Sequence, residues 1–314
     1  MAKRSAATYH RFMNIRTLPA RVTPARDLVV PALLACYLVW GSTYLAIRFA
    51  LASFPPFFQM GTRFLAAGVL LMAWTRARGG RWPTAIEWRN AAVIGTLMLG
   101  LGMGLTASAE QHVGSGLVAA FIGVVPVLVC LWGLLFGRRP KRLEVAGMAV
   151  GLAGVLLLVR GASFAAAPIA IASMAAATLA WSLGSVLSTT TRLQLAAGPA
   201  GFASEMLCGG AVLMALSLVL GEQPQWPPQA LAALAWLYLV VAGSLVAFSA
   251  YLYLLAHASP ALATSYAFVN PVIALVLGVG FAGEVVSASE WTACAVVLTG
   301  VVLILKARTA RAVV

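Results

Sequence analysis

Charge is scarce in this sequence of 314 residues. Charged side chains make up 9% of the chain, whereas hydrophobic side chains make up 62%, and the mean hydropathy is +0.95. So little charge cannot cover the surface of a soluble globule of this length. The composition therefore predicts a membrane protein.

Residues that bind metals or catalyse reactions are also few. The chain has one aspartate, Asp27, together with three histidines and four cysteines. His112 and His257 fall at opposite faces of the predicted bilayer, about 30 Å apart, so they cannot share a zinc ion. The cysteines lie in four different apolar runs and lack paired spacing. We therefore expect no metal, no cofactor and no enzymatic activity.

No Walker-type phosphate loop is present, which argues against direct ATP hydrolysis as the energy source. The glycine-rich stretches GLGMG (100–104) and GMAVGLAG (147–154) follow no strand and lie inside apolar runs. Small residues at such spacings let helices pack closely in membranes. We expect them to pack helices within one chain or between copies of the chain, which leaves a homo-oligomer open.

Long apolar runs are, by contrast, abundant. About 20 apolar residues cross a bilayer as a helix, and these runs show none of the period-two alternation of barrel strands. The sequence contains ten such runs, at about 28–48, 57–75, 90–107, 113–136, 143–159, 168–190, 201–220, 231–255, 261–282 and 290–306. The predicted fold is therefore an all-α integral membrane protein with ten transmembrane helices.

The basic residues gather in alternate joints between these runs. Of the 21 lysines and arginines, 18 lie before the first run, after the last, or in the joints that follow runs two, four and six. The positive-inside rule places these segments, and so both termini, in the cytoplasm. Residues 1–27 contain no apolar stretch, so we expect a basic cytoplasmic tail rather than a signal peptide, with a second tail at 307–314. The charge of +13 thus indicates anionic lipid rather than nucleic acid as a partner.

The two halves of the chain resemble each other. AAGVLLMA (66–73) matches CGGAVLMA (208–215), and EVAGMAVGLAGVLLLVR (144–160) matches EWTACAVVLTGVVLILK (290–306). These matches predict two repeats, residues 28–160 and 161–306. Each repeat has five runs, an odd number, so the second must enter the membrane from the opposite side. The result is an inverted repeat, which allows alternating access.

Polar clusters interrupt the first and sixth runs. WGSTY (40–44) holds Trp40, Ser42 and Tyr44, and WSLGS (181–185) holds Trp181, Ser182 and Ser185. Polar residues facing lipid are costly, whereas polar residues lining a central cavity bind a substrate. The second interpretation, that glycine and serine only permit close helix packing, stays open.

Two full charges lie clear of the ends of the runs, Arg63 in the second and Glu205 in the seventh. They lie 142 residues apart, the same offset that aligns residues 66–73 with residues 208–215, so they occupy corresponding positions in the two halves. Charges inside membranes are functional candidates by default. Arg63 is a candidate for binding a substrate carboxylate, against a structural role at backbone carbonyls. Glu205 is a candidate for proton coupling, against extension of its side chain to the membrane surface.

The stretches WGSTYLAIRFAL, PFFQMGTRFLAAGVLLMAW and SAEQHVGSGLVAAFIGVVPVLVCLWGLLFGRRP, with ASPALATSYAFVNPVIALVLGVGFAGE in the second half, resemble EamA-type members of the drug/metabolite transporter superfamily. The resemblance covers about residues 30–306 and implies ten helices from two repeats. It implies helix-loosening roles for Pro126 and Pro271. It also places further residues on helices that surround the cavity. These are Tyr44, Phe121, Trp181, Tyr251, Tyr266 and Asn270.

The resemblance implies a secondary transporter of the bacterial inner membrane that exports small amphipathic metabolites such as amino acids by alternating access. A mostly apolar pocket with few polar anchors fits such substrates. A translocator of lipids or lipid-linked sugars is the nearest alternative. An intramembrane enzyme and a structural subunit are weaker alternatives, since no cluster of catalytic residues is evident.

Overall fold

A computed structural model describes residues 28–113, 115–158, 168–189, 193–282 and 287–309. The predicted tail at 1–27 and the last five residues of the predicted tail at 307–314 lie outside the described residues, whereas 307–309 continue the last helix. Every element within the described residues is helical. These helices coincide with the ten predicted runs.

The helices of the first half are α1 (Val29–Ala35), η1 (Cys36–Trp40), α2 (Gly41–Ala50), α3 (Pro56–Ala77), α4 (Ala85–Gly95), η2 (Thr96–Met103), α5 (Gly104–Ala109), α6 (Ser115–Phe121), η3 (Ile122–Val124), α7 (Val125–Leu135) and α8 (Arg142–Leu158). The helices of the second half are α9 (Pro168–Leu187), α10 (Pro199–Val219), α11 (Ala230–Tyr238), η5 (Leu239–Phe248), α12 (Ser249–His257), α13 (Pro260–Ala263), α14 (Tyr266–Ala282) and α15 (Ala288–Thr309).

Seven helical stretches within the described residues are long and apolar enough to cross a membrane. They are Val29–Ala50, Pro56–Ala77, Ala85–Ala109, Val118–Leu135, Pro168–Leu187, Pro199–Val219 and Ala230–His257. α8 has 17 residues, α15 contains a shorter apolar stretch, Trp291–Ala307, and the ninth run is divided into α13 and α14. Seven of the ten predicted spans therefore meet the length and hydropathy of a span within the described residues, and the number ten stays a prediction.

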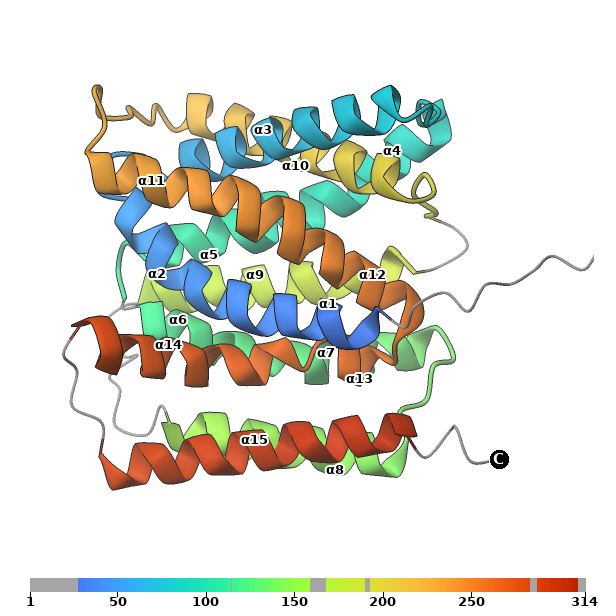
Figure 1. Ribbon diagram of the computed structural model, residues 1–314, viewed down its shortest axis with the longest axis vertical. Coiled ribbons are helices and arrows are strands. Elements are labelled where there is room, and N and C mark those ends of the chain that lie inside the picture. Colours follow the sequence, from blue (N-terminus) through green and yellow to red (C-terminus); the bar gives the residue numbers. More distant parts are fainter. Residues whose placement is uncertain (1–27, 114, 159–167, 190–192, 283–286, 310–314) are drawn as a thin grey trace, which may run out of the picture.

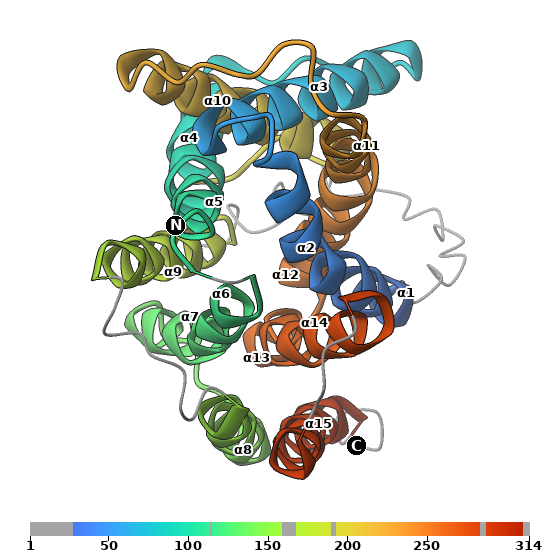
Figure 2. The same cartoon turned by 90° about the vertical axis from the view of Figure 1, so that its left-hand side faces the viewer.

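The helices lie side by side in a bundle that is longest across the helix axes (Figure 1). α3 packs against α10 at one extreme of the long direction, and α8 packs against α15 at the other. The remaining helices lie between these two pairs, as the turned view shows (Figure 2). α1 begins and α15 finishes at the same end of the bundle. The α3–α4 and α7–α8 joints, with Arg78, Arg81, Arg138 and Arg139, also lie there, and we call it the basic end.

Close contact between α8 and α15 depends on glycines. A Cβ atom on Gly300 would lie 2.5 Å from the backbone nitrogen of Gly151, and one on Gly147 would lie 2.7 Å from the carbonyl oxygen of Gly300. The glycine-rich stretch at 147–154 therefore packs two helices within the chain.

We expect Gly300→Ala to lower the free energy of unfolding by about 1–3 kcal/mol, because backbone atoms cannot move aside as a side chain can. Thermal unfolding in detergent measures this change. Gly133→Ala in α7 is the matched control, since the nearest atom to its new Cβ would lie at 3.6 Å, an ordinary contact. Equal melting temperatures for both variants would show that α8 and α15 are not packed through Gly300.

Three stretches of the described part of the chain are π-helical: η1, η2 and η5. Such wide turns are rare and gather at functional sites. The two predicted helix-loosening prolines differ in their effects. Pro126 follows the 3₁₀ turn η3 at the start of α7, whereas α14 continues through Pro271. One missing backbone bond does not end a helix that is packed among neighbours, so the expected break at Pro271 is absent.

The ninth run is interrupted instead at Thr264 and Ser265, between α13 and α14. The Thr264 hydroxyl donates to the carbonyl of Pro260 at 2.7 Å, and the Ser265 hydroxyl donates to that of Leu262 at 2.7 Å. The same two carbonyls also accept backbone N–H bonds, from Thr264 at 3.1 Å and from Ser265 at 3.2 Å, so the hydroxyls add a second hydrogen bond to each.

Candidate functional site

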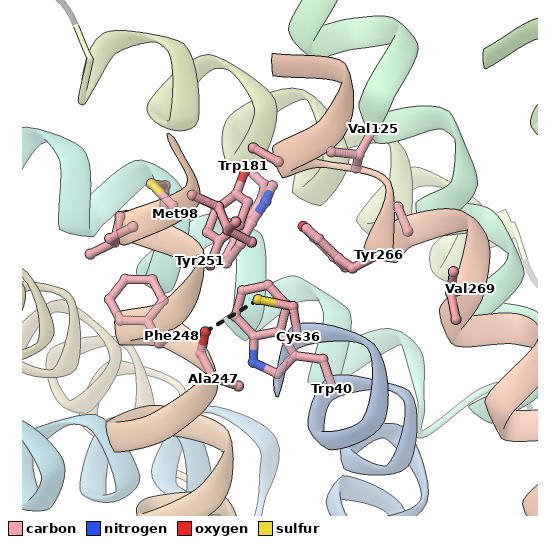
Figure 3. Packing of buried hydrophobic residues seen from close by; sticks show 14 of the residues in the cluster. Cys36, Trp40, Met98, Val125, Trp181, Ala247, Phe248, Tyr251, Tyr266 and Val269 are labelled. Carbon is pink, nitrogen blue, oxygen red and sulfur yellow. Dashed lines mark hydrogen bonds between the residues drawn. The ribbon is translucent and has the colours of Figure 1, made fainter. Parts of the chain in front are cut away.

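Four aromatic side chains meet at the centre of the bundle (Figure 3). Trp40 comes from η1, Trp181 from α9, Tyr251 from α12 and Tyr266 from α14. We call them the aromatic cluster. The ring centroid of Trp40 lies 5.6 Å from that of Trp181, 5.2 Å from that of Tyr251 and 4.7 Å from that of Tyr266. Both halves of the chain therefore contribute to one set of rings.

The other contacts in the aromatic cluster fix its geometry. Tyr251 stacks on Trp181 with centroids 5.4 Å apart and meets Tyr266 edge-on at 5.3 Å. Such pairs contribute about 0.5–1.5 kcal/mol each beyond the burial of their area. The Tyr251 hydroxyl donates to the Ser185 Oγ at 2.8 Å, and the Trp40 Nε1 donates to the carbonyl of Gly243 at 3.1 Å. Rings and hydroxyls thus hold each other in place.

The Trp181 indole nitrogen differs from that of Trp40. It is buried and has no hydrogen-bond acceptor within the described part of the chain. A buried donor without a partner is costly. The Tyr251 and Tyr266 side chains act on this indole without accepting a hydrogen bond of normal geometry from it, and a ligand that carries an acceptor would supply one.

Two spaces lie in the bundle, and the smaller one adjoins the aromatic cluster. A wide vestibule of about 1440 Å³ lies beside the α7–α8 joint and the adjoining ends of α9 and α12, at the basic end. A small cavity of about 30 Å³ is lined by three cluster residues and by Thr43, Tyr44, Ile47, Gly102, Met103, Thr106, Ile122 and Ala177. The second volume holds about one water molecule.

The aromatic cluster contributes to the small cavity, and chain neighbours of the cluster contribute to the vestibule. Leu252 and Ser188 line the vestibule, and they adjoin Tyr251 and the turn that carries Ser185. Trp40, Trp181 and Tyr266 line the small cavity. The two spaces share no lining residue.

Arg63 is buried, with 1% of its surface exposed, and it does not line either space. Its Nε donates to the Ser244 Oγ at 2.7 Å, one terminal nitrogen reaches the Met60 sulfur at 3.6 Å, and the guanidinium lies 4.9 Å from the centre of the Phe64 ring. A Cβ on Gly243 would approach the other terminal nitrogen to 2.7 Å. The guanidinium therefore joins α3 to η5.

Glu205 in α10 is completely buried. Neither of its carboxylate oxygens has a hydrogen-bond partner within the described residues. Its backbone packs closely against Gly95 of α4. Among the described residues an ion pair is found between Arg81 and Glu87 and none between Arg63 and Glu205.

The remaining predicted site residues lie around the aromatic cluster. Tyr44 lines the small cavity and accepts a hydrogen bond from Asn270 at 3.5 Å. Phe121 packs against a buried group that includes Tyr44. Ser182 accepts a hydrogen bond from the Trp132 indole at 3.0 Å, and Ser42 bonds the Tyr238 hydroxyl at 2.6 Å. The last two hydroxyls therefore join helices and do not line the cavity.

Several residues that line the small cavity were not predicted. Thr43 and Thr106 are polar residues inside apolar runs, and this was a signal that sequence reasoning could have used. Gly102, Met103, Ile122 and Ala177 carry no such signal, since any membrane helix contains residues of these kinds. No group of three or more histidine, cysteine or acidic residues that could hold a metal ion occurs within the described residues.

An apolar cavity with a few polar groups, enclosed by helices of both halves, is the kind of site that a helical membrane carrier uses. The model of the EamA-like transporter family matches residues 28–160 and 168–306. The chain belongs to this family and is a membrane protein.

Several proteins are similar to it. One, named an uncharacterized inner membrane transporter, YedA of Escherichia coli strain K12, is 42% identical over 87% of this chain and 89% of its own length. Protein PecM of Dickeya dadantii is 27% identical over 86% of this chain and 87% of its own. A solved crystal structure at 26% identity superposes with a TM-score of 0.72, covering 91% of this chain and 99% of that chain.

Proposed function

We propose that this protein is a secondary transporter that exports small amphipathic metabolites, such as amino acids, across the bacterial inner membrane by alternating access. The observation that carries the proposal is the aromatic cluster, which both halves of the chain contribute and which lines a small cavity in the bundle. Rings bind the apolar part of such a substrate, and the unpaired Trp181 nitrogen offers a donor to its polar part.

The proposal includes two inverted repeats, residues 28–160 and 161–306. Three observations support it. The third and eighth runs both contain a long π-helical stretch, η2 and η5. α3 packs against α10, and α8 against α15, which pairs corresponding helices of the two halves. Arg63 contacts the eighth run while its counterpart Glu205 packs against the third.

We assign the basic end to the cytoplasm, with both termini there, because basic joints stay inside. The name of the relative YedA supports the inner membrane. In this proposal the vestibule opens inward, and the small cavity belongs to the outer part of the pathway. Export would require the aromatic cluster to part and the small cavity to widen, since about 30 Å³ holds no metabolite.

Glu205 is the candidate coupling residue of this proposal, since it is buried, ionisable and unpartnered among the described residues. The domain division and the roles of Ser42, Ser182 and Phe121 in substrate binding stay predictions.

A translocator of lipids or lipid-linked sugars is the second candidate. The observation in its favour is the vestibule, which is lined by Arg138, Arg139 and Lys141 and suits an anionic headgroup. Such a protein would also need a lateral opening for acyl chains.

Purified protein in liposomes tests the two candidates. We expect uptake of labelled amino acids that is absent from empty liposomes and from liposomes with heat-denatured protein. Scrambling of a labelled lipid without amino acid uptake would replace the first candidate with the second. Neither activity, in a preparation shown to be folded by its thermal unfolding, would contradict both.

A further inference from the structure

Three buried acceptor atoms of two residues that follow or contact the wall of the small cavity have no donor within the described residues. They are both carboxylate oxygens of Glu110 and the side-chain oxygen of Asn270. Glu110 is 5% exposed and Asn270 is completely buried. Buried acceptors without donors are costly, so natural proteins seldom keep several of them together unless a ligand supplies the donors.

Both residues adjoin the wall of the small cavity. The backbone nitrogen of Glu110 donates to the carbonyl of Thr106 at 3.2 Å, so Glu110 lies one helical turn beyond a residue that lines the cavity. Tyr44 lines the cavity, bonds Asn270 at 3.5 Å and lies near enough to Glu110 for an electrostatic interaction. Tyr44 thus relates both residues to the cavity wall, and we call Glu110, Asn270 and Tyr44 the acceptor group.

We propose that the acceptor group binds the ammonium group of a transported amine, with the organic part of the amine against the aromatic cluster. The proposal rests on the proposed transport function and names the class of substrate. An alkylammonium ion carries three N–H donors and one positive charge, which match three acceptors and one carboxylate. The neighbouring rings of Trp40, Trp181 and Tyr266 attract cations through their faces.

An arginine or a metal ion matches the acceptor group less well than an ammonium group does. Arg48 acts electrostatically on Glu110 but forms no ion pair with it within the described residues, and its own side chain is exposed. A calcium or magnesium ion takes six or more oxygen ligands, whereas this group offers three free acceptors and a hydroxyl. The three N–H donors of an ammonium group need three acceptors, which is the number that the acceptor group provides.

The charge on Glu110 adds a pH dependence. Burial raises the pKa of the Glu110 carboxyl well above its ordinary value, and the Arg48 guanidinium acts in the opposite direction. The titratable groups that interact with Glu110 from a neighbouring element are Arg48 and Tyr44, both on α2. His112, two residues further along the chain, is exposed, and the Asn270 side chain on α14 does not titrate. Rising pH ionises the carboxyl while alkylamines, like lysine with a pKa near 10.4, stay charged. Amine binding should therefore strengthen as pH rises.

Phenethylammonium chloride is the probe, and the purified protein is monitored by thermal unfolding and by tryptophan fluorescence. We expect the probe to raise the melting temperature of the wild-type protein, more at pH 8 than at pH 6. In Glu110→Gln the apparent affinity should fall by about tenfold or more, as loss of a charge-assisted hydrogen bond predicts. The dependence on pH should also disappear.

Three controls sharpen the test. Glu87→Gln removes a partly buried carboxylate that pairs with Arg81 at the start of α4, and it should leave probe binding unchanged. The double variant Glu110→Gln with Asn270→Asp moves the charge to the other side of the acceptor group and should restore much of the affinity. The carboxylate analogue 3-phenylpropionate should not bind at the acceptor group.

The outcomes separate the two proposals. No stabilisation by the probe, or stabilisation that Glu110→Gln leaves unchanged, would overturn the ammonium site even where liposomes take up amino acids. Stabilisation by sodium chloride but not by choline chloride, lost in Glu110→Gln and without an effect of the probe, would also overturn it, in favour of an inorganic cation. Binding that depends on Glu110 without any uptake would support the site and contradict transport.

Discussion

Trp181→Ala should abolish stabilisation by any transported substrate and reduce uptake into liposomes by about tenfold or more. Trp181 stacks on Tyr251, meets Trp40 edge-on and lines the small cavity, so its removal takes away one wall of the site. The same substitution leaves a cavity and should lower the free energy of unfolding by about 3–5 kcal/mol. Thermal unfolding with and without substrate measures both effects.

Matched variants separate the loss of the site from the loss of the fold. Trp291→Ala removes a tryptophan that is 49% exposed on α15, and uptake should stay at the wild-type rate. Trp181→Phe keeps a ring, should remain folded and should retain part of the uptake. Wild-type uptake by folded Trp181→Ala protein would show that the aromatic cluster is not on the transport pathway.

Ser244→Ala should destabilise the protein by about 2 kcal/mol, because it leaves the buried Arg63 guanidinium without its side-chain oxygen acceptor. Arg63→Met should be tolerated far better. It removes the buried charge and keeps a long apolar side chain, a replacement that is often neutral or stabilising. Thermal unfolding of the two variants in the same detergent compares them directly.

Measurements of substrate binding distinguish a structural role of Arg63 from direct contact with the substrate. The guanidinium joins two helices and lies outside both spaces, so Arg63→Met should bind substrate with an affinity close to that of the wild type. Ser182→Ala is a comparison variant, since that hydroxyl also serves a helix contact, with Trp132. Loss of substrate stabilisation in Arg63→Met with an unchanged melting temperature would show that Arg63 binds the substrate directly.

The positions of the helices in the sequence could be predicted, because a bilayer requires long apolar runs in the helices that cross it. Apolar runs of span length are unambiguous, and each predicted run coincides with helices in the described residues. The interruption at Thr264 and Ser265 could not be found in this way, since the signal there, a proline at 271, lies one to two turns further along the chain. The hydroxyls of Thr264 and Ser265 bond to carbonyls of the preceding turn, and hydropathy does not predict such bonds.

The centre of the site could be predicted in part. Trp40 and Trp181 occupy matching positions in the two halves of the sequence, and they do meet in space. Ser42 and Ser182 belong to the same polar clusters but point toward Tyr238 and Trp132, because direction depends on the rotation of each helix. Glu110 could not be recognised, since in sequence it falls in a polar joint and its burial comes from neighbouring helices.

The wide turns of η1, η2 and η5 have a geometric consequence. An α-helix advances about 100° per residue, so a turn that holds an extra residue offsets the faces before and after it by about that angle. Trp40 stands at the last position of η1, and Gly243 and Ser244 stand within η5. Each of these helices can thus bury one stripe against neighbours along one part of its length and aim a different stripe at the interior along the rest. Within η5, Gly243 accepts a hydrogen bond from Trp40, and Ser244 accepts one from Arg63 of α3. The wide turns of η5 thus direct two neighbouring residues to two different helices.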